Sequence, residues 1–265
     1  MSSDEVIVTV VAILVGPVLW MAWLFRMSQM RARARRGGVM AMGLTLVVCA
    51  GFLLYVLQTA ASFDVIDAPK YLFMYVVLGL AWLRVAAAMF PFLGLSPRDE
   101  VFERGNRASA TAVVGALGAV TLCYAGGNIG DGPGWWVVLF AAALATGTLL
   151  VTWAALTRLT AVIDAVTIDR DPAAGLRLGA FLYACGLVLG RGVAGDWMSA
   201  AATVADFAEA LPGVLVMLVL AIIVERASRP SQQRPRAPFI ALGVLPAGLY
   251  IAVAITAVWM MQWPI

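Results

Sequence analysis

Eight long apolar runs follow one another along the 265-residue chain and constrain its fold more than any other feature. A helix needs about 20 mostly apolar residues to cross the hydrocarbon core of a bilayer. Only 12% of the residues are charged, against roughly a quarter in an ordinary soluble domain. The sequence therefore predicts an all-α, polytopic membrane helical bundle of about eight transmembrane helices, in which residues 1–265 form a single transmembrane domain. We expect the spans near residues 5–26, 38–60, 70–94, 108–128, 134–157, 174–194, 206–227 and 238–262.

The loops between these runs alternate between a basic set and an acidic set. Basic loops stay on the cytoplasmic side of an inner membrane, so we expect the basic set there and both termini on the non-cytoplasmic side. The protein is thus predicted to be a multi-pass protein of a bacterial cytoplasmic membrane. The acidic set carries Asp64, Asp67, Asp131 and Asp196. The basic set holds 15 of the 18 Lys and Arg residues, namely Arg26, Arg31, Arg33, Arg35, Arg36, Arg98, Arg104, Arg107, Arg158, Arg170, Arg177, Arg226, Arg229, Arg234 and Arg236.

An offset of 65 residues relates corresponding features of the chain. The segments Asn106-Arg-Ala-Ser-Ala and Asp171-Pro-Ala-Ala-Gly both open a span at this offset. One unit of that length holds two spans, so consecutive units have the same orientation, as in parallel repeats related by an axis along the membrane normal. We therefore predict four parallel helical-hairpin repeats, at about residues 1–65, 66–130, 131–197 and 198–265.

Two motifs of the middle hairpins point to a family. The first reads Pro97-Arg-Asp-Glu-Val-Phe-Glu-Arg-Gly-Asn106-Arg-Ala-Ser-Ala and precedes a glycine-rich helix; the second reads Asp169-Arg-Asp-Pro-Ala-Ala-Gly175. Together they resemble the YjfL-like inner-membrane family, which carries the domain of unknown function number 350. The resemblance covers roughly residues 70–197 and implies that the outer hairpins are additions to a four-span form. Asp171 stands where Asn is the commoner choice in the family, which has no established activity, so the resemblance implies a fold and no mechanism.

Four charged residues are candidates for an intramembrane polar site. Arg84 lies some ten residues from the cytoplasmic end of the expected third span, at a depth of about 15 Å. A charge at that depth costs several kcal/mol unless it snorkels or finds a partner, so Arg84 is either structural or part of an anion or lipid-headgroup path. Arg191 lies near the outer end of the sixth span. Asp206 and Glu209, three residues apart on one helix face, either pair with it or form a cation-binding vestibule.

Other residues have simpler predicted roles. Asn106 and Asp171 are expected to cap the helices that follow them, by accepting hydrogen bonds from unpaired backbone amides. The basic cluster of Arg31, Arg33, Arg35 and Arg36 is expected at anionic lipid headgroups, where attraction is worth about 1 kcal/mol per basic residue. Glycines recur in the fourth and sixth spans at a spacing that lets helices approach closely, so we expect these spans at the centre of the bundle.

The composition excludes several kinds of function. The chain has no histidine, which removes histidine metal ligands and Ser-His-Asp triads. Its three cysteines lie in apolar runs, where a thiol behaves as a small hydrophobic group. The basic residues are divided among loops between spans and form no nucleic-acid-binding surface. We therefore predict no cofactor, no metal, no nucleic-acid partner and no enzymatic activity.

Two classes of function remain, with a membrane enzyme acting on lipid as a weaker third. Short loops, few intramembrane polar groups and glycine-rich helix faces favour a non-catalytic scaffold or accessory subunit. Such a protein binds membrane lipids and either a protein partner or further copies of itself. The repeat, Arg84 and the outer acidic residues favour a transporter or channel for a small ion, solute or lipid. A water-filled cavity that reaches Arg84 is expected for transport, and a closely packed interior for the accessory role.

Overall fold

A computed structural model describes residues 1–29, 35–228 and 238–261; the side chains of residues 35 and 36 are not described. Within these ranges the regular elements are helices, and an isolated bridge joins Ala61 to Gly130. In the described part of the chain, seven helices are long and apolar enough to cross a membrane, or eight if the bent pair α10 and α11 counts as one span. The prediction of an all-α bundle with about eight spans is therefore confirmed.

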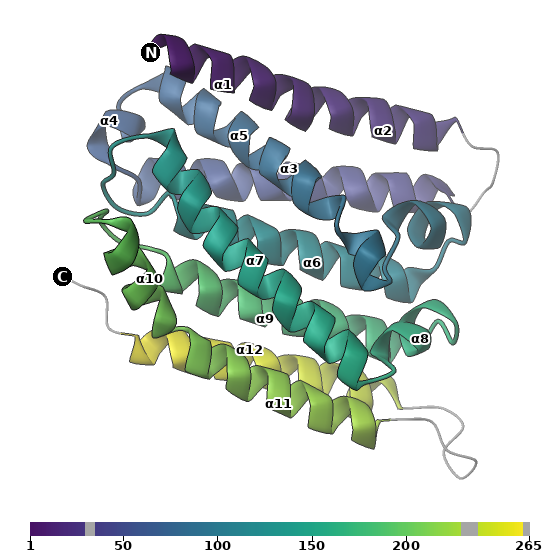
Figure 1. The fold of residues 1–265 in the computed structure, drawn as a ribbon. Coiled ribbons are helices and arrows are strands. Elements are labelled where there is room, and N and C mark those ends of the chain that lie inside the picture. The colour runs from purple at the N-terminus through teal and green to yellow at the C-terminus, as the bar shows by residue number, and fades with distance from the viewer. Residues whose placement is uncertain (30–34, 229–237, 262–265) are drawn as a thin grey trace.

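The spans form four antiparallel hairpins in chain order (Figure 1). In the first hairpin α1 (Ser3–Ile13), η1 (Leu14–Val18) and α2 (Leu19–Ser28) lead to α3 (Arg35–Thr59). The second and third pair α5 (Pro69–Ala87) with α6 (Arg107–Gly126), and α7 (Trp135–Leu159) with α9 (Pro172–Gly192). The fourth pairs α10 (Ala200–Ala208) and α11 (Leu211–Ala227) with η4 (Ile240–Val244) and α12 (Leu245–Met260). Short elements in the loops are α4 (Phe63–Ile66), η2 (Phe90–Leu93), η3 (Pro97–Glu103) and α8 (Val162–Thr167).

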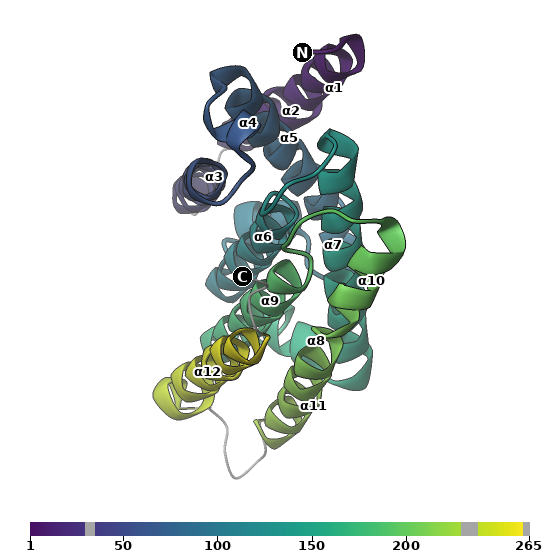
Figure 2. The ribbon, with the colours of Figure 1, turned by 90° about the vertical axis from the view of Figure 1, so that its left-hand side faces the viewer.

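Each hairpin contributes one helix to each of two layers (Figure 2). One layer runs α3, α6, α9 and α12, with each helix in contact with the next. The other layer holds the first segment of each hairpin, from α1 and α2 through α5 and α7 to α10 and α11. The α5 and α7 helices are joined there by a hydrogen bond from the Trp82 indole to the Thr146 hydroxyl, 3.0 Å long.

The two ends of the bundle differ in charge. We call the end with loops 60–68, 127–134 and 193–199 the terminal end, because Met1 and the last turn of α12 lie there (Figure 1). We call the opposite end, with loops 88–106 and 160–171, the basic end, because most of the described arginines lie in these loops or near the helix ends beside them. They include Arg26, Arg98, Arg104, Arg107, Arg158, Arg170, Arg177 and Arg226, and the two loops also carry six carboxylates. The alternation of basic and acidic loops in the sequence is thus a difference between two faces of the folded molecule.

The α6 and α9 helices form the centre of the bundle and touch backbone to backbone. A Cβ atom on Gly115 would lie only 2.4 Å from the Cα of Gly179, and one on Gly126 only 2.0 Å from the carbonyl oxygen of Gly190. Within these two spans 67% and 78% of the most apolar window is buried, against 17% for the first span. The glycine spacing seen in the sequence therefore creates the contact between these helices, as small residues do in membrane bundles.

Corresponding residues of the middle hairpins make equivalent contacts at the basic end. The backbone amide of Asn106 donates to the Glu100 carbonyl, and the backbone amide of Asp171 donates to the Ala165 carbonyl, each over 2.9 Å. The two donor residues are 65 residues apart, and so are the two acceptor residues. These contacts fit the proposed repeat, while the division of the chain into four repeated units and the assignment of two of them to a family domain stay predictions.

Two of the expected span boundaries are wrong. The third span was expected to reach residue 94, but α5 ends at Ala87, because Pro91 supplies no amide hydrogen and Gly94 adopts a left-handed φ of 85°. The seventh span was expected to begin at residue 206, but its helical segment begins at Ala200, behind the N-cap Ser199. It then bends by 42° before α11.

Candidate functional site

Arg84 lies much closer to the end of its helix than the sequence predicts. It is three residues from Ala87, the last residue of α5, and therefore only about 5 Å from the end of the helix at the basic end. This distance is shorter than the expected depth of about 15 Å because the apolar segment after α5 folds into the separate turn η2, while the depth of Arg84 in the membrane stays a prediction. Arg84 therefore lies near the basic end of the bundle, next to the turn η2.

Arg84 has no carboxylate partner among the described residues. All 15 Asp and Glu residues of the chain fall in the described ranges, and none of them forms an ion pair with Arg84. Its Nε atom is enclosed and has no hydrogen-bond partner there. The guanidinium carbon lies 5.6 Å from the ring centroid of Trp20, within the range of a cation–π contact. The Trp20 indole is itself held by a 3.0 Å hydrogen bond to the Leu80 carbonyl.

A cavity of about 200 Å³ extends beside Arg84 at the basic end. Its mouth includes exposed residues of the turn that follows α5, and its floor is made of buried side chains of α3 and α6. The lining residues used below are Trp20, Met42, Arg84, Ser96, Arg98 and Leu117. A cavity therefore reaches Arg84, but its floor is closed toward the middle of the bundle.

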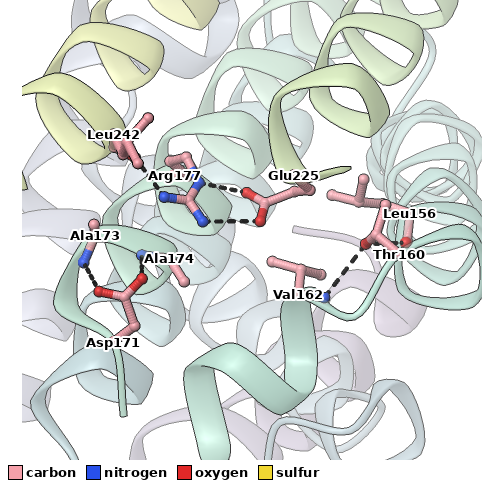
Figure 3. A network of polar contacts seen from close by, with 9 residues as sticks. All are labelled: Leu156, Thr160, Val162, Asp171, Ala173, Ala174, Arg177, Glu225 and Leu242. Carbon is pink, nitrogen blue, oxygen red and sulfur yellow. Dashed lines mark hydrogen bonds and ion pairs between the residues drawn. The ribbon is translucent and has the colours of Figure 1, made fainter. Parts of the chain in front are cut away.

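A second charged centre joins the third and fourth hairpins at the basic end (Figure 3). Arg177 of α9 donates from Nε to Glu225 Oε1 over 2.6 Å and from Nη2 to Glu225 Oε2 over 2.9 Å. Its Nη1 atom donates to the carbonyl of Leu242 in the π-helical turn η4. The Arg177 and Glu225 side chains are only 2% and 5% exposed. One guanidinium thus fastens α9, α11 and η4 together.

This pair is not predicted from the sequence, where Arg177 counts among the basic-loop residues and Glu225 has no predicted role. A signal was present: both residues lie inside apolar helices, where an ionisable group is expected to have a partner. Nothing local relates them, because they are 48 residues apart and meet only when α9 packs against α11. A cavity of about 80 Å³ adjoins the pair and is also lined by Asp164, Asp169 and Ser228.

Arg191, Asp206 and Glu209 lie at the terminal end, far from Arg84 along the helix direction. Arg191 donates to the carbonyls of Ala194 and Met261 over 3.5 and 3.4 Å. Glu209, the C-cap of α10, lies at the edge of an apolar groove of about 580 Å³ between α11 and α12. The structure therefore does not combine the four predicted residues into one site, and the vestibule at Arg191 stays a prediction.

Asn106 and Asp171 make capping hydrogen bonds at the starts of α6 and α9. Asn106 Oδ1 accepts from two amides of the first turn of α6 over 3.0 and 3.3 Å, and the Asp171 carboxylate accepts from two amides of α9 over 3.0 and 3.2 Å. Asn106 also donates from Nδ2 to the Val166 carbonyl over 2.8 Å and to the Glu100 carboxylate over 3.1 Å. Its amide group therefore also links the two middle hairpins, which a carboxylate at this position would not do.

The basic cluster falls largely outside the described residues. Arg31 and Arg33 are not described, and Arg35 and Arg36 begin α3 without described side chains. Their predicted contact with anionic lipid stays a prediction.

A polar cavity of about 290 Å³ opens at the terminal end, between α1, α5 and the loop 127–134. Its lining includes the side chains of Glu5, Asp64, Tyr71, Tyr75 and Asp131. The Tyr71 hydroxyl donates to Glu5 over 3.4 Å. No group of three or more Cys, Asp or Glu residues in the described ranges is arranged to hold a metal ion.

Comparison with known proteins finds no matching family model, no matching curated protein and no matching solved structure. Membership of the YjfL-like family therefore stays a proposal, and it rests on the motifs in residues 97–110 and 169–175.

Proposed function

We propose that this integral membrane protein is a non-catalytic scaffold or accessory subunit of the bacterial inner membrane, associated with a protein partner or with further copies of itself. The observation that carries the proposal is the backbone-to-backbone contact of α6 and α9, because it closes the centre of the bundle. The cavities described above lie at the two ends or along the edge between α11 and α12. An interior of this kind supports a rigid body better than a path for solute.

The outer spans support association with another chain. The most apolar windows of the first, second and last spans are only 17%, 28% and 22% buried within the chain. The two layers of helices therefore end in open apolar edges, which lipid or a further helical protein must cover. Membrane helices associate through close packing, so these edges are suited to an interface with another chain.

The test is the mass of the intact assembly after gentle extraction. We expect native mass spectrometry, with cross-linking in the membrane before extraction, to give a defined complex larger than the 28.1 kDa chain. The proposal would be contradicted by two results together: no cross-linked species from the membrane, and the mass of a single chain after extraction.

Transport of a small solute is the second candidate, and one specific observation favours it. The polar cavity at the terminal end and the cavity beside Arg84 lie at opposite ends of the first two hairpins. Between them lie the buried side chains of Leu53 and Tyr124, which fill the space left by Gly79 of α5. A transporter in a closed state has such an arrangement, with a cavity at each end and packed side chains between the two cavities.

A flux assay separates the two functions. Wild-type protein and the Arg84→Ala variant are reconstituted in liposomes and compared for the flux of small cations, anions and neutral solutes. Flux that depends on Arg84 would support transport and contradict the accessory role. Absence of flux for every solute in both proteins is the result expected for a scaffold.

A further inference from the structure

We propose that the cavity beside Arg84 binds the phosphate group of an anionic membrane phospholipid. The site lies between α2, α3, α5 and α6 at the basic end, and the side chains of Arg84, Arg98 and Ser96 supply its hydrogen-bond donors. This binding does not depend on the scaffold role, because either function is compatible with a bound lipid.

The charges in the cavity favour an anion. Two arginines line it, and no Asp or Glu does. Arg84 brings a guanidinium without a counter-ion into the end of a membrane span, a position that is costly unless an anion is bound. The planar guanidinium fork matches two oxygens of a phosphate, so it gains two charge-assisted hydrogen bonds at once.

The other two polar groups are free to turn toward such a ligand. Arg98 forms an ion pair with Glu103 over 3.3 Å, but the two side chains are 62% and 40% exposed, and exposed pairs contribute little. Ser96 accepts a hydrogen bond from the Asp99 amide over 3.2 Å, and its own hydroxyl hydrogen has no acceptor among the described residues. Arg98 and Ser96 therefore offer further donors at the mouth.

The apolar surroundings favour a lipid over inorganic phosphate. The floor includes the buried side chains of Met42 and Leu117, and the Trp20 ring centroid lies 5.6 Å from the guanidinium carbon of Arg84. Three apolar side chains of the α5 end and η2 are exposed: Val85 at 54%, Met89 at 40% and Phe92 at 83%. None of the three lines the cavity, but each is the chain neighbour of a residue that does, so a lipid bound at Arg84 has exposed apolar side chains close by for its acyl chains. Inorganic phosphate gains nothing from these contacts.

The experiment compares ligands on purified, delipidated protein in detergent. Dioctanoyl phosphatidylglycerol, dioctanoyl phosphatidylcholine and inorganic phosphate are titrated separately, and bound ligand is counted by native mass spectrometry. We expect phosphatidylglycerol to bind most tightly and Arg84→Gln to weaken its binding about tenfold or more, as expected for losing hydrogen bonds to a charged group.

The matched control is Arg158→Gln. Arg158 occupies the last turn of α7 at the same end of the bundle and is exposed, so its loss removes the same charge without touching the cavity. We expect it to change binding by less than about twofold, since it makes none of the direct contacts. Equal losses of lipid affinity in the two variants would overturn the proposal, because the lipid would then be attracted by the overall charge of the basic end and not by the cavity. Phosphate that binds as tightly as the lipid, with the same dependence on Arg84, would overturn the assignment to a lipid.

Two further variants serve if Arg84→Gln fails to fold. Arg84→Lys keeps the charge but loses the planar fork, and Arg98→Gln removes the second arginine. We expect each to weaken phosphatidylglycerol binding severalfold, in line with the loss of one charge-assisted contact. Wild-type affinity in both variants would overturn the proposal.

Discussion

Replacement of Glu225 by leucine is expected to destabilise the protein by about 3 kcal/mol, since removing one partner of a buried pair costs about 3–5 kcal/mol. The variant leaves the Arg177 guanidinium, which is 2% exposed, with the Leu242 carbonyl as its one remaining hydrogen-bond partner among the described residues. The lost contacts are the two hydrogen bonds of 2.6 and 2.9 Å. We choose the lower end of the range because the adjoining cavity of about 80 Å³ has room for a few water molecules.

The double variant Arg177→Met, Glu225→Leu should recover most of this loss. Apolar residues of similar volume remove the buried charge altogether, and such replacements are often neutral or stabilising by about 1–4 kcal/mol. Thermal unfolding in detergent, followed by circular dichroism, measures both effects. A loss of about 3 kcal/mol corresponds to a fall of about 10 °C in Tm for a chain of this size.

The control is Glu103→Leu, which removes the carboxylate of the exposed pair with Arg98 and should change stability by no more than about 1 kcal/mol. Two results would refute the reasoning. One is a Glu225→Leu variant as stable as the wild type, which would mean that Arg177 is well solvated in the folded protein. The other is a double variant no more stable than the single one, which would mean that packing and not charge causes the loss.

Three further predictions concern topology, the helix contact and the cap. Single cysteines at Gly37 and Gly132 should react with impermeant maleimide from opposite sides of the membrane, with little background from the three buried native cysteines; labelling from one side would contradict the topology. Gly126→Ala should lower stability in thermal unfolding by about 1–3 kcal/mol, because its Cβ meets a carbonyl of α9 at 2.0 Å. Gly147→Ala is the control, since its Cβ meets nothing within 4 Å, and equal Tm values for the two variants would refute the contact. Asn106→Asp keeps the cap but loses the 2.8 Å bond to the Val166 carbonyl and should cost about 1–3 kcal/mol; an unchanged Tm would show that the link is dispensable.

The sequence by itself determined the features that depend on neighbouring residues. Runs of apolar residues predict the spans, and Asn106 and Asp171 predict helix starts, because a cap bonds to amides two and three residues along. The glycines of α6 also predict close packing, since their effect on helix approach depends only on their small size.

The tertiary structure alone decided which charged groups meet and how far they lie from the ends of their helices. Arg177 and Glu225 are partners because the rotation and packing of α9 and α11 bring them together, and no local pattern encodes that rotation. The sequence predicts too long a helix after Arg84 because apolarity continues through η2, although Pro91 and Gly94 prevent the α-helix from continuing. The cavity beside Arg84 is shaped by four helices from two hairpins. Composition is a property of each segment, whereas a partner or a cavity is a property of how segments pack.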